Sequence, residues 1–146
     1  MSIPAGKVRA VAICICRHRG RILVFEGVDR VKQETFYRPL GGTIEFGERS
    51  EDAVRREFRE EIGADLEDVR YLGTLENIFT CDGKPGHEIV LVYDGRLVDE
   101  TLYQQESFGG DEMGTPFKAL WVSLNPEERR GTPLYPDGLV ELLRQE

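Results

Sequence analysis

The sequence contains no long apolar run. No hydrophobic stretch approaches the roughly 20 residues that a membrane-spanning helix requires, and the N-terminal residues lack the basic-then-apolar pattern of a secretory signal peptide. We therefore expect no membrane association and a cytoplasmic location. Hydrophobic residues still make up 40% of the 146 residues, which predicts one domain over 1–146 with a core of its own.

Positive charge is also scarce. The chain has 19 Lys and Arg against 27 Asp and Glu, giving a formal net charge of −8. A broad basic surface for a nucleic-acid backbone is therefore not expected, and we predict no nucleic-acid polymer as a partner. A small anionic ligand would be repelled unless a metal cation mediated between it and the protein.

Cysteine is rare, with only three in the chain. Cys14 and Cys16 lie two apart in a strand-like run, so they point to the same face and are too far apart for an easy disulfide. No further Cys or His stands near enough to form a zinc-binding pattern with them. We expect these two and Cys81 to be buried, reduced thiols.

One helix is predicted clearly, over residues 50–62. Val54, Phe58 and Ile62 recur at every fourth position and form an apolar stripe for the core. Ser50 is the expected N-cap, and Gly63 the expected terminator.

Strands are expected on both sides of this helix. The predicted strands cover residues 8–16, 21–25, 71–79, 87–98 and 119–124, the first two forming a hairpin, and a closing helix covers 137–144. Residues 33–47 are expected to be a loop with short extended pieces, and 99–118 a long loop of the kind that is often functional. This order predicts an α/β fold layered around a mixed sheet.

The predicted helix also carries an acidic face. Glu57, Glu60 and Glu61 are spaced i, i+3 and i+4, so their side chains share one side of the helix. Carboxylates grouped in this way suit Mg²⁺, which prefers oxygen ligands and completes its shell with substrate phosphates. Acidic residues on a helix are more often simply solvated, and the three glutamates alone do not separate these readings.

The segment from Gly42 to Ala64 resembles the Nudix box in full. That motif is G-x5-E-x7-R-E-U-x-E-E-x-G-U, where U is a bulky apolar residue, and only the small Ala64 is a weak match. The preceding residues 38–42, Arg-Pro-Leu-Gly-Gly, also resemble the usual approach to the box. We regard the resemblance as covering most of residues 7–143.

The resemblance implies the Nudix fold, an α/β/α sandwich with a mixed β-sheet and a loop–helix–loop catalytic motif. It also implies Mg²⁺ as cofactor, with Mn²⁺ as a substitute. By position, the implied metal ligands are Gly42, Glu57, Glu60 and Glu61, of which Glu60 and Glu61 are also catalytic candidates. Glu48 and Arg56 match the pair that holds the loop to the helix, a supporting role of the kind that metal sites need.

Residues outside the box are weaker candidates. Family members commonly recruit one more carboxylate, for which Glu112, Glu106 and Glu88 are available; we favour Glu112, in the long loop, as a catalytic residue. Arg38, Tyr37 and His87 are candidates for substrate binding. The alternative for each is an ordinary surface or core role. Phe79 and Tyr103 are further candidates for stacking on a base, although core roles are commoner for such residues.

The implied activity is metal-dependent hydrolysis of a diphosphate linkage in a nucleoside diphosphate linked to another moiety. Nucleoside triphosphates, including oxidised ones, are the favoured substrates; ADP-ribose, diadenosine polyphosphates and nucleotide sugars are alternatives. A non-catalytic, nucleotide-binding regulatory domain is the alternative function, and a homodimer is left open. Retention of all three box glutamates favours the enzyme.

Overall fold

The computed structural model describes residues 6–145 and contains eight strands and three helical segments. The strands are β1 (Val8–His18), β2 (Arg21–Asp29), β3 (Glu34–Pro39), β4 (Gly41–Thr43), β5 (Leu66–Cys81), β6 (Lys84–Leu97), β7 (Ser107–Glu112) and β8 (Thr115–Ser123). The helices are α1 (Ser50–Ile62), the 3₁₀ helix η1 (Glu100–Gln104) and α2 (Leu139–Arg144). No helix within residues 6–145 is long and apolar enough to cross a membrane.

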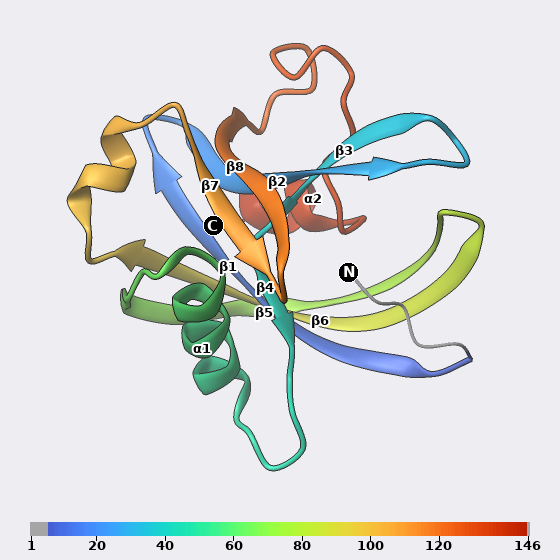
Figure 1. The fold of residues 1–146 in the computed structure, drawn as a ribbon, viewed down its shortest axis with the longest axis horizontal. Coiled ribbons are helices and arrows are strands. Elements are labelled where there is room, and N and C mark those ends of the chain that lie inside the picture. The colour runs from blue at the N-terminus through green and yellow to red at the C-terminus, as the bar shows by residue number, and fades with distance from the viewer. Residues whose placement is uncertain (1–5, 146) are drawn as a thin grey trace.

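The strands form one mixed sheet in the order β5-β6-β1-β2-β8-β7, with β3 paired to β2 and β4 paired to β1. β1 and β6 are parallel, from Val8 opposite His87 to Cys16 opposite Gly95, and the other named strand pairs are antiparallel. Helices α1 and α2 cover different faces (Figure 1). The predicted α/β/α sandwich with a mixed sheet is confirmed.

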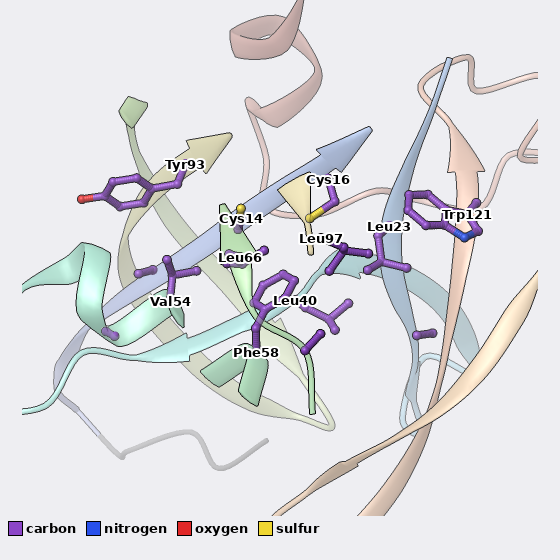
Figure 2. Close-up of a cluster of buried hydrophobic side chains, with 14 residues drawn as sticks. Cys14, Cys16, Leu23, Leu40, Val54, Phe58, Leu66, Tyr93, Leu97 and Trp121 are labelled. Carbon is purple, nitrogen blue, oxygen red and sulfur yellow. The ribbon is translucent and has the colours of Figure 1, made fainter. Parts of the chain in front are cut away.

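The two faces of β1 contribute to two separate core clusters. The cluster beneath α1 contains Ala12, Cys14 and Cys16, and Figure 2 shows Phe58 of α1 pointing into it beside Leu40. The other cluster lies beneath α2 and receives the alternate β1 residues Val11, Ile13 and Ile15. Because every residue from 11 to 16 is buried, β1 is the central strand from which both layers are built.

The prediction for the cysteines is confirmed in part. All three are free thiols, and Cys14 and Cys16 are fully buried. Cys81 is only half-buried, at the end of β5, because it lies beside the β5–β6 turn.

Helix α1 spans the predicted residues, but its N-cap was predicted wrongly. Arg49 occupies the cap position and makes no side-chain capping bond. The Ser50 hydroxyl instead pairs with the Tyr93 hydroxyl at 2.5 Å, so negative charge from Glu51 and Asp52 is what complements the N-terminus. At the other end Gly63 adopts the left-handed conformation, with φ 65°, and ends the helix as predicted.

The prediction of a long loop over residues 99–118 was wrong. This segment contains η1, β7 and the start of β8, and β7 pairs with β8 from Ser107 opposite Leu120 to Glu112 opposite Thr115. Two consecutive glycines in β7 hide the strand pattern in the sequence, and the pairing with β8 imposes it. Residues 33–47 likewise contain β3 and β4, because β3 is paired along its length with an extended β2.

Two hairpins extend from the sheet as arms, β2–β3 and β5–β6 (Figure 1). Their tips are joined: the Arg30 backbone N–H donates to Asp82 at 2.7 Å, and Lys32 Nζ donates to the Thr80 carbonyl at 2.9 Å. The arms and their linked tips therefore bound the space between them.

Candidate functional site

The two glycines of β4 bring the backbone up against helix α1. Gly41 and Gly42 pair with Ile13 and Ala12 of β1. A Cβ on Gly41, whose φ is 151°, would lie 2.1 Å from the Ala12 carbonyl oxygen. A Cβ on Gly42 would lie 2.5 Å from Cδ of Glu57, so the Gly42 backbone lies directly against the Glu57 carboxylate.

Glu57 and Glu61 are carboxylates held out of water. Only 9% of Glu61 is exposed, and 16% of the Glu57 side chain. Burial raises the pKa of Glu61 to about 9, the negative charges of Glu57 and Glu112 add to this rise, and a hydrogen bond from the Gly41 backbone opposes it. Burial also raises the pKa of Glu57. Among the described residues, Glu61 Oε1 has no hydrogen-bond partner, so a buried acceptor is left for a cation or a proton.

Glu112 joins this pair from a different element. It ends β7, and its negative charge contributes to the raised pKa of both Glu57 and Glu61. The structure thus brings together the favoured extra carboxylate and the two box glutamates. The rival candidates lie elsewhere: Glu106 lines a hollow beside His18 and Trp121, and Glu88 is buried in an ion pair with Arg38.

Glu60 lies at the rim of the site. Its side chain is 59% exposed, and it accepts a hydrogen bond from Arg56 Nη1 at 3.2 Å. Its charge is among the smaller contributions to the raised pKa of Glu61. Glu60 therefore shares the helical face of the site without being enclosed by it.

Arg56 connects the loop, the helix and the acidic cluster. Its Nε and Nη2 donate to the two carboxylate oxygens of Glu48, and its Nη1 donates to Glu57 Oε1 at 2.8 Å. Nη2 also reaches the Thr43 carbonyl at 3.1 Å. These bonds raise the pKa of Arg56 above its ordinary value and lower that of Glu48. Glu48 and Arg56, predicted to support the box, are in direct contact.

The donor set fits a hard divalent cation. Glu57, Glu61, Glu112 and the backbone carbonyl of Gly42 offer only oxygen ligands, as Mg²⁺ prefers. Within residues 6–145 no three acidic, His or Cys side chains are already grouped at metal-binding geometry, and an Arg56 N–H occupies one oxygen of Glu57. A bound cation would take over the charge compensation that Arg56 supplies in part.

A cleft of about 390 Å³ opens between the two arms. Its walls include the aromatic side chains of Phe25, Phe36, Phe79 and Tyr135, and acidic groups line other parts of it. Arg38 also lines this cleft, although it is only 5% exposed. The cleft combines apolar rings with a buried cation, a composition typical of a binding site for a planar polar ligand.

Not every predicted substrate residue lies at this cleft. Tyr37 packs in the α2 cluster, where its backbone pairs with residues 133–135, and is not among the cleft residues. His87 is half-buried on β6 and is not among the residues that line the cleft, and its Nε2 lacks a hydrogen-bond partner in the described part of the chain. Tyr103 stacks on Trp121, with ring centroids 5.3 Å apart, so it is a core residue.

Most of the cleft residues were not predicted from the sequence. Phe25 and Phe36 lie on the same face of the β2–β3 pairing as Arg38, at alternate positions. Alternation along β3 was a signal that would have identified Phe36 together with Arg38. No local signal pointed to Tyr135, which reaches the cleft from the segment before α2.

The chain is similar to known proteins over most of its length. The family model described as NUDIX domain matches residues 6–134. The chain is also 44% identical over 59 residues to the NAD-capped RNA hydrolase NudC of Mycobacterium tuberculosis, an alignment that covers 36% of this chain. The same values hold for the protein of that name from Mycobacterium bovis. The match spans only 19% of the length of these curated relatives.

Two solved structures share the fold. A MutT NUDIX hydrolase from Burkholderia pseudomallei has a TM-score of 0.60 and 21% identity, over 86% of this chain and 95% of that one. A NUDIX hydrolase from Nitrosomonas europaea has a TM-score of 0.65 and 17% identity, over 94% of this chain and 87% of that one. At these identities the likeness concerns the fold.

Proposed function

The chain belongs to the Nudix family, and on that premise we propose that it is a metal-dependent pyrophosphohydrolase acting on a diphosphate linkage in a nucleotide. The observation that carries the proposal is that Glu57 lies against the Gly42 backbone while the charges of Glu57, Glu61 and Glu112 act on one another. Three carboxylates from two elements, two of them largely buried, form a site that a divalent cation would stabilise and a solvated acidic face would not explain.

In the proposed reaction, water attacks one phosphorus of the anhydride, the P–O bond to the bridging oxygen breaks, and two phosphorylated products leave. Bound Mg²⁺ would neutralise phosphate charge and favour ionisation of the attacking water. Glu57 and Glu61 would hold the cation together with the Gly42 carbonyl. Glu112, which approaches from β7, would accept the proton of the water. Glu60, at the exposed rim, is a further ligand in this scheme.

The nucleoside half of the substrate would occupy the cleft between the arms. Its volume of about 390 Å³ suits a nucleoside-sized group. Phe25, Phe36 and Phe79 offer ring surfaces for a base, and Arg38 offers hydrogen-bond donors. We place Arg38 in substrate binding on this basis, whereas Tyr37 and His87 have no such support.

Nucleoside triphosphates, including oxidised ones, are our preferred substrates, because the cleft between the arms suits one nucleoside-sized group. ADP-ribose, diadenosine polyphosphates and nucleotide sugars, which carry a second large group, are the alternative substrates. The mycobacterial relatives are hydrolases of NAD-capped RNA by name, so a capped nucleotide belongs in the comparison. We propose a cytoplasmic protein that binds small nucleotides.

A product-resolved screen tests the proposal. Purified protein is incubated with nucleoside triphosphates, oxidised nucleotides, ADP-ribose, diadenosine polyphosphates, nucleotide sugars and NAD, each with Mg²⁺, Mn²⁺ or a chelator. We expect turnover of at least one class with metal and none with the chelator. The matched control is Glu57→Gln/Glu61→Gln. Binding without turnover of any substrate in the wild type would instead favour a regulatory nucleotide-binding domain.

A further inference from the structure

Four polar side chains form a buried network at the base of the cleft. Glu88 of β6 is 2% exposed, and its Oε1 accepts a hydrogen bond from Arg38 Nη2 at 2.8 Å. The same oxygen accepts from Asn77 Nδ2 at 3.3 Å, and Oε2 pairs with Arg9. Because Arg38 belongs to β3 and Glu88 to β6, the network joins the two arms on either side of the cleft.

Glu88 is charged in this setting. Burial by itself would raise the pKa of Glu88, but the positive charges of Arg38 and Arg9 hold it below its ordinary value. A buried ion pair of this kind contributes little net stability compared with apolar side chains of similar size. Stability alone therefore does not account for two arginines and a glutamate placed here, whereas a fixed orientation of one arginine does.

Arg38 is the member of this network that lines the cleft. Only its Nη2 forms a hydrogen bond to another protein side chain in the described part of the chain, which leaves donors of the same guanidinium for a ligand. A guanidinium is planar, with its N–H groups in a fixed fork. Once Glu88 holds one nitrogen, the direction of the remaining donors is set.

We propose that Glu88 is a positioning residue for the substrate: it fixes Arg38 so that the free donors of the guanidinium bind a hydrogen-bond acceptor on the nucleoside half in the cleft. The inference rests on the proposed function for the presence of a nucleotide. The acceptor is an oxygen or nitrogen of the base, or an oxygen of the adjoining phosphate. Glu88 itself touches no substrate, because both of its oxygens are engaged by protein groups.

The test measures the binding of nucleoside monophosphates without divalent metal. Under these conditions binding is measured separately from turnover. The monophosphates of the nucleosides in the panel are titrated by calorimetry into wild type, Glu88→Gln, Arg38→Gln and the double variant. Each single variant should weaken binding by about tenfold or more, as expected for hydrogen bonds to a charged group. The double variant should bind no more weakly than Arg38→Gln alone. Additive losses would overturn the proposal, because Glu88 would then act independently of Arg38.

Arg9→Gln is the matched control. It removes the other ion pair of Glu88 and leaves the Arg38 contact in place. We expect it to lower the melting temperature while changing nucleotide affinity by less than about threefold. An affinity loss as large as that of Glu88→Gln would assign the whole network a structural role and overturn the proposal.

Three further measurements complete the test. With a substrate identified, Glu88→Gln should raise KM and leave kcat within about threefold; loss of kcat at saturation would overturn the positioning role. Arg38→Lys keeps the buried charge but loses the planar, forked set of N–H donors. This variant tests the proposal even if Glu88→Gln does not fold. Unchanged nucleotide affinity in Arg38→Lys would contradict the proposal. Titration of the unphosphorylated nucleoside identifies the acceptor: the loss persists if the acceptor is on the base and disappears if it is on the phosphate.

Discussion

Arg56 of α1 donates two parallel hydrogen bonds to the Glu48 carboxylate, from Nε at 2.8 Å and from Nη2 at 2.9 Å. Glu48 lies in the loop between β4 and α1, so this pair fastens the loop to the helix. The same guanidinium donates to Glu57. One arginine therefore links the conformation of the loop to the position of a proposed metal ligand.

Replacing Arg56 with Lys should weaken the site. Lysine keeps the charge but cannot form the bidentate pair, so we expect a lower affinity for Mg²⁺, a lower kcat and a melting temperature lower by a few degrees. Thermal unfolding with and without Mg²⁺ measures these effects. Arg59→Lys is the control, because Arg59 pairs with Asp65 at the surface and such pairs contribute little. Equal behaviour of the two variants would argue against the role of Arg56.

The two glycines of β4 should respond differently to alanine. The Cβ of Gly41→Ala would meet backbone atoms of Ala12 and Ile13, so this variant should melt well below wild type. The Cβ of Gly42→Ala would meet the end of the Glu57 side chain, which can turn away. We expect Gly42→Ala to fold and to lose Mg²⁺ affinity. Melting curves and Mg²⁺ titrations distinguish the two, and a fully active Gly42→Ala would contradict the site geometry.

Metal should stabilise the folded protein through Glu57 and Glu61. A cation that binds only the folded state stabilises it by about 2.7 kcal/mol at one hundred times Kd, so millimolar Mg²⁺ should raise the melting temperature by several degrees. Each of Glu57→Gln and Glu61→Gln should lower kcat by about 100-fold or more, and the double variant should gain little from Mg²⁺. Glu51→Gln, an exposed change on the same helix, is the control. An undiminished Mg²⁺ effect in the double variant would place the cation elsewhere.

The catalytic role of Glu112, the proposed third carboxylate, can be tested by comparing it with Glu106. Glu112→Gln should reduce kcat strongly, because the charge of Glu112 acts on both Glu57 and Glu61. Glu106→Gln should leave kcat near the wild-type value, since Glu106 lies in a different hollow. Steady-state kinetics on the identified substrate measures both. Small, equal effects would mean that the chemistry depends on the box alone.

The raised pKa of Glu61 predicts how metal and pH are linked. In the metal-free folded protein its pKa is about 9, against an ordinary value of 4.5. Between these pH values the folded state holds a proton that the unfolded chain has lost, so this group makes the free energy of unfolding fall as pH rises. Mg²⁺ binding at pH 7 should then release about one proton, measurable by calorimetry in buffers of different ionisation enthalpy. Glu61→Gln should abolish both the release and this part of the pH slope.

The sequence predicted those features that depend on residues close together in the chain. Helix α1 was predicted over its full span because an apolar residue every fourth position and a terminal glycine define it. The same period placed Glu57 and Glu61 on one face. Five of the eight strands were predicted, and β2 and β5 were predicted too short, because their outer parts lie in the two arms, where the apolar pattern is interrupted.

The remaining features depend on pairing between distant segments. β7 exists because it pairs with β8, so Glu112 was favoured for its place in a supposed loop and is in fact delivered by a strand. The contact between Arg38 and Glu88 joins residues that are 50 apart in the sequence, and no local sequence pattern predicts this contact. Tyr37 and Arg38 were both proposed to bind substrate, yet neighbours on a strand point to opposite faces, and only Arg38 lines the cleft.

The parallel pairing of β1 with β6 also sets a constraint during translation. The strands meet through residues as far apart as Arg9 and Glu88, which are separated by 79 positions. At about 5 to 20 residues per second on the ribosome, β1 emerges about 4 to 16 s before its partner strand has been synthesised. During that interval residues 11–16, buried on both faces in the finished domain, can pair with β4 but have no partner on the β6 side. The β6-facing edge of β1 is therefore open for longer in the nascent chain than in the folded protein, where β6 covers it.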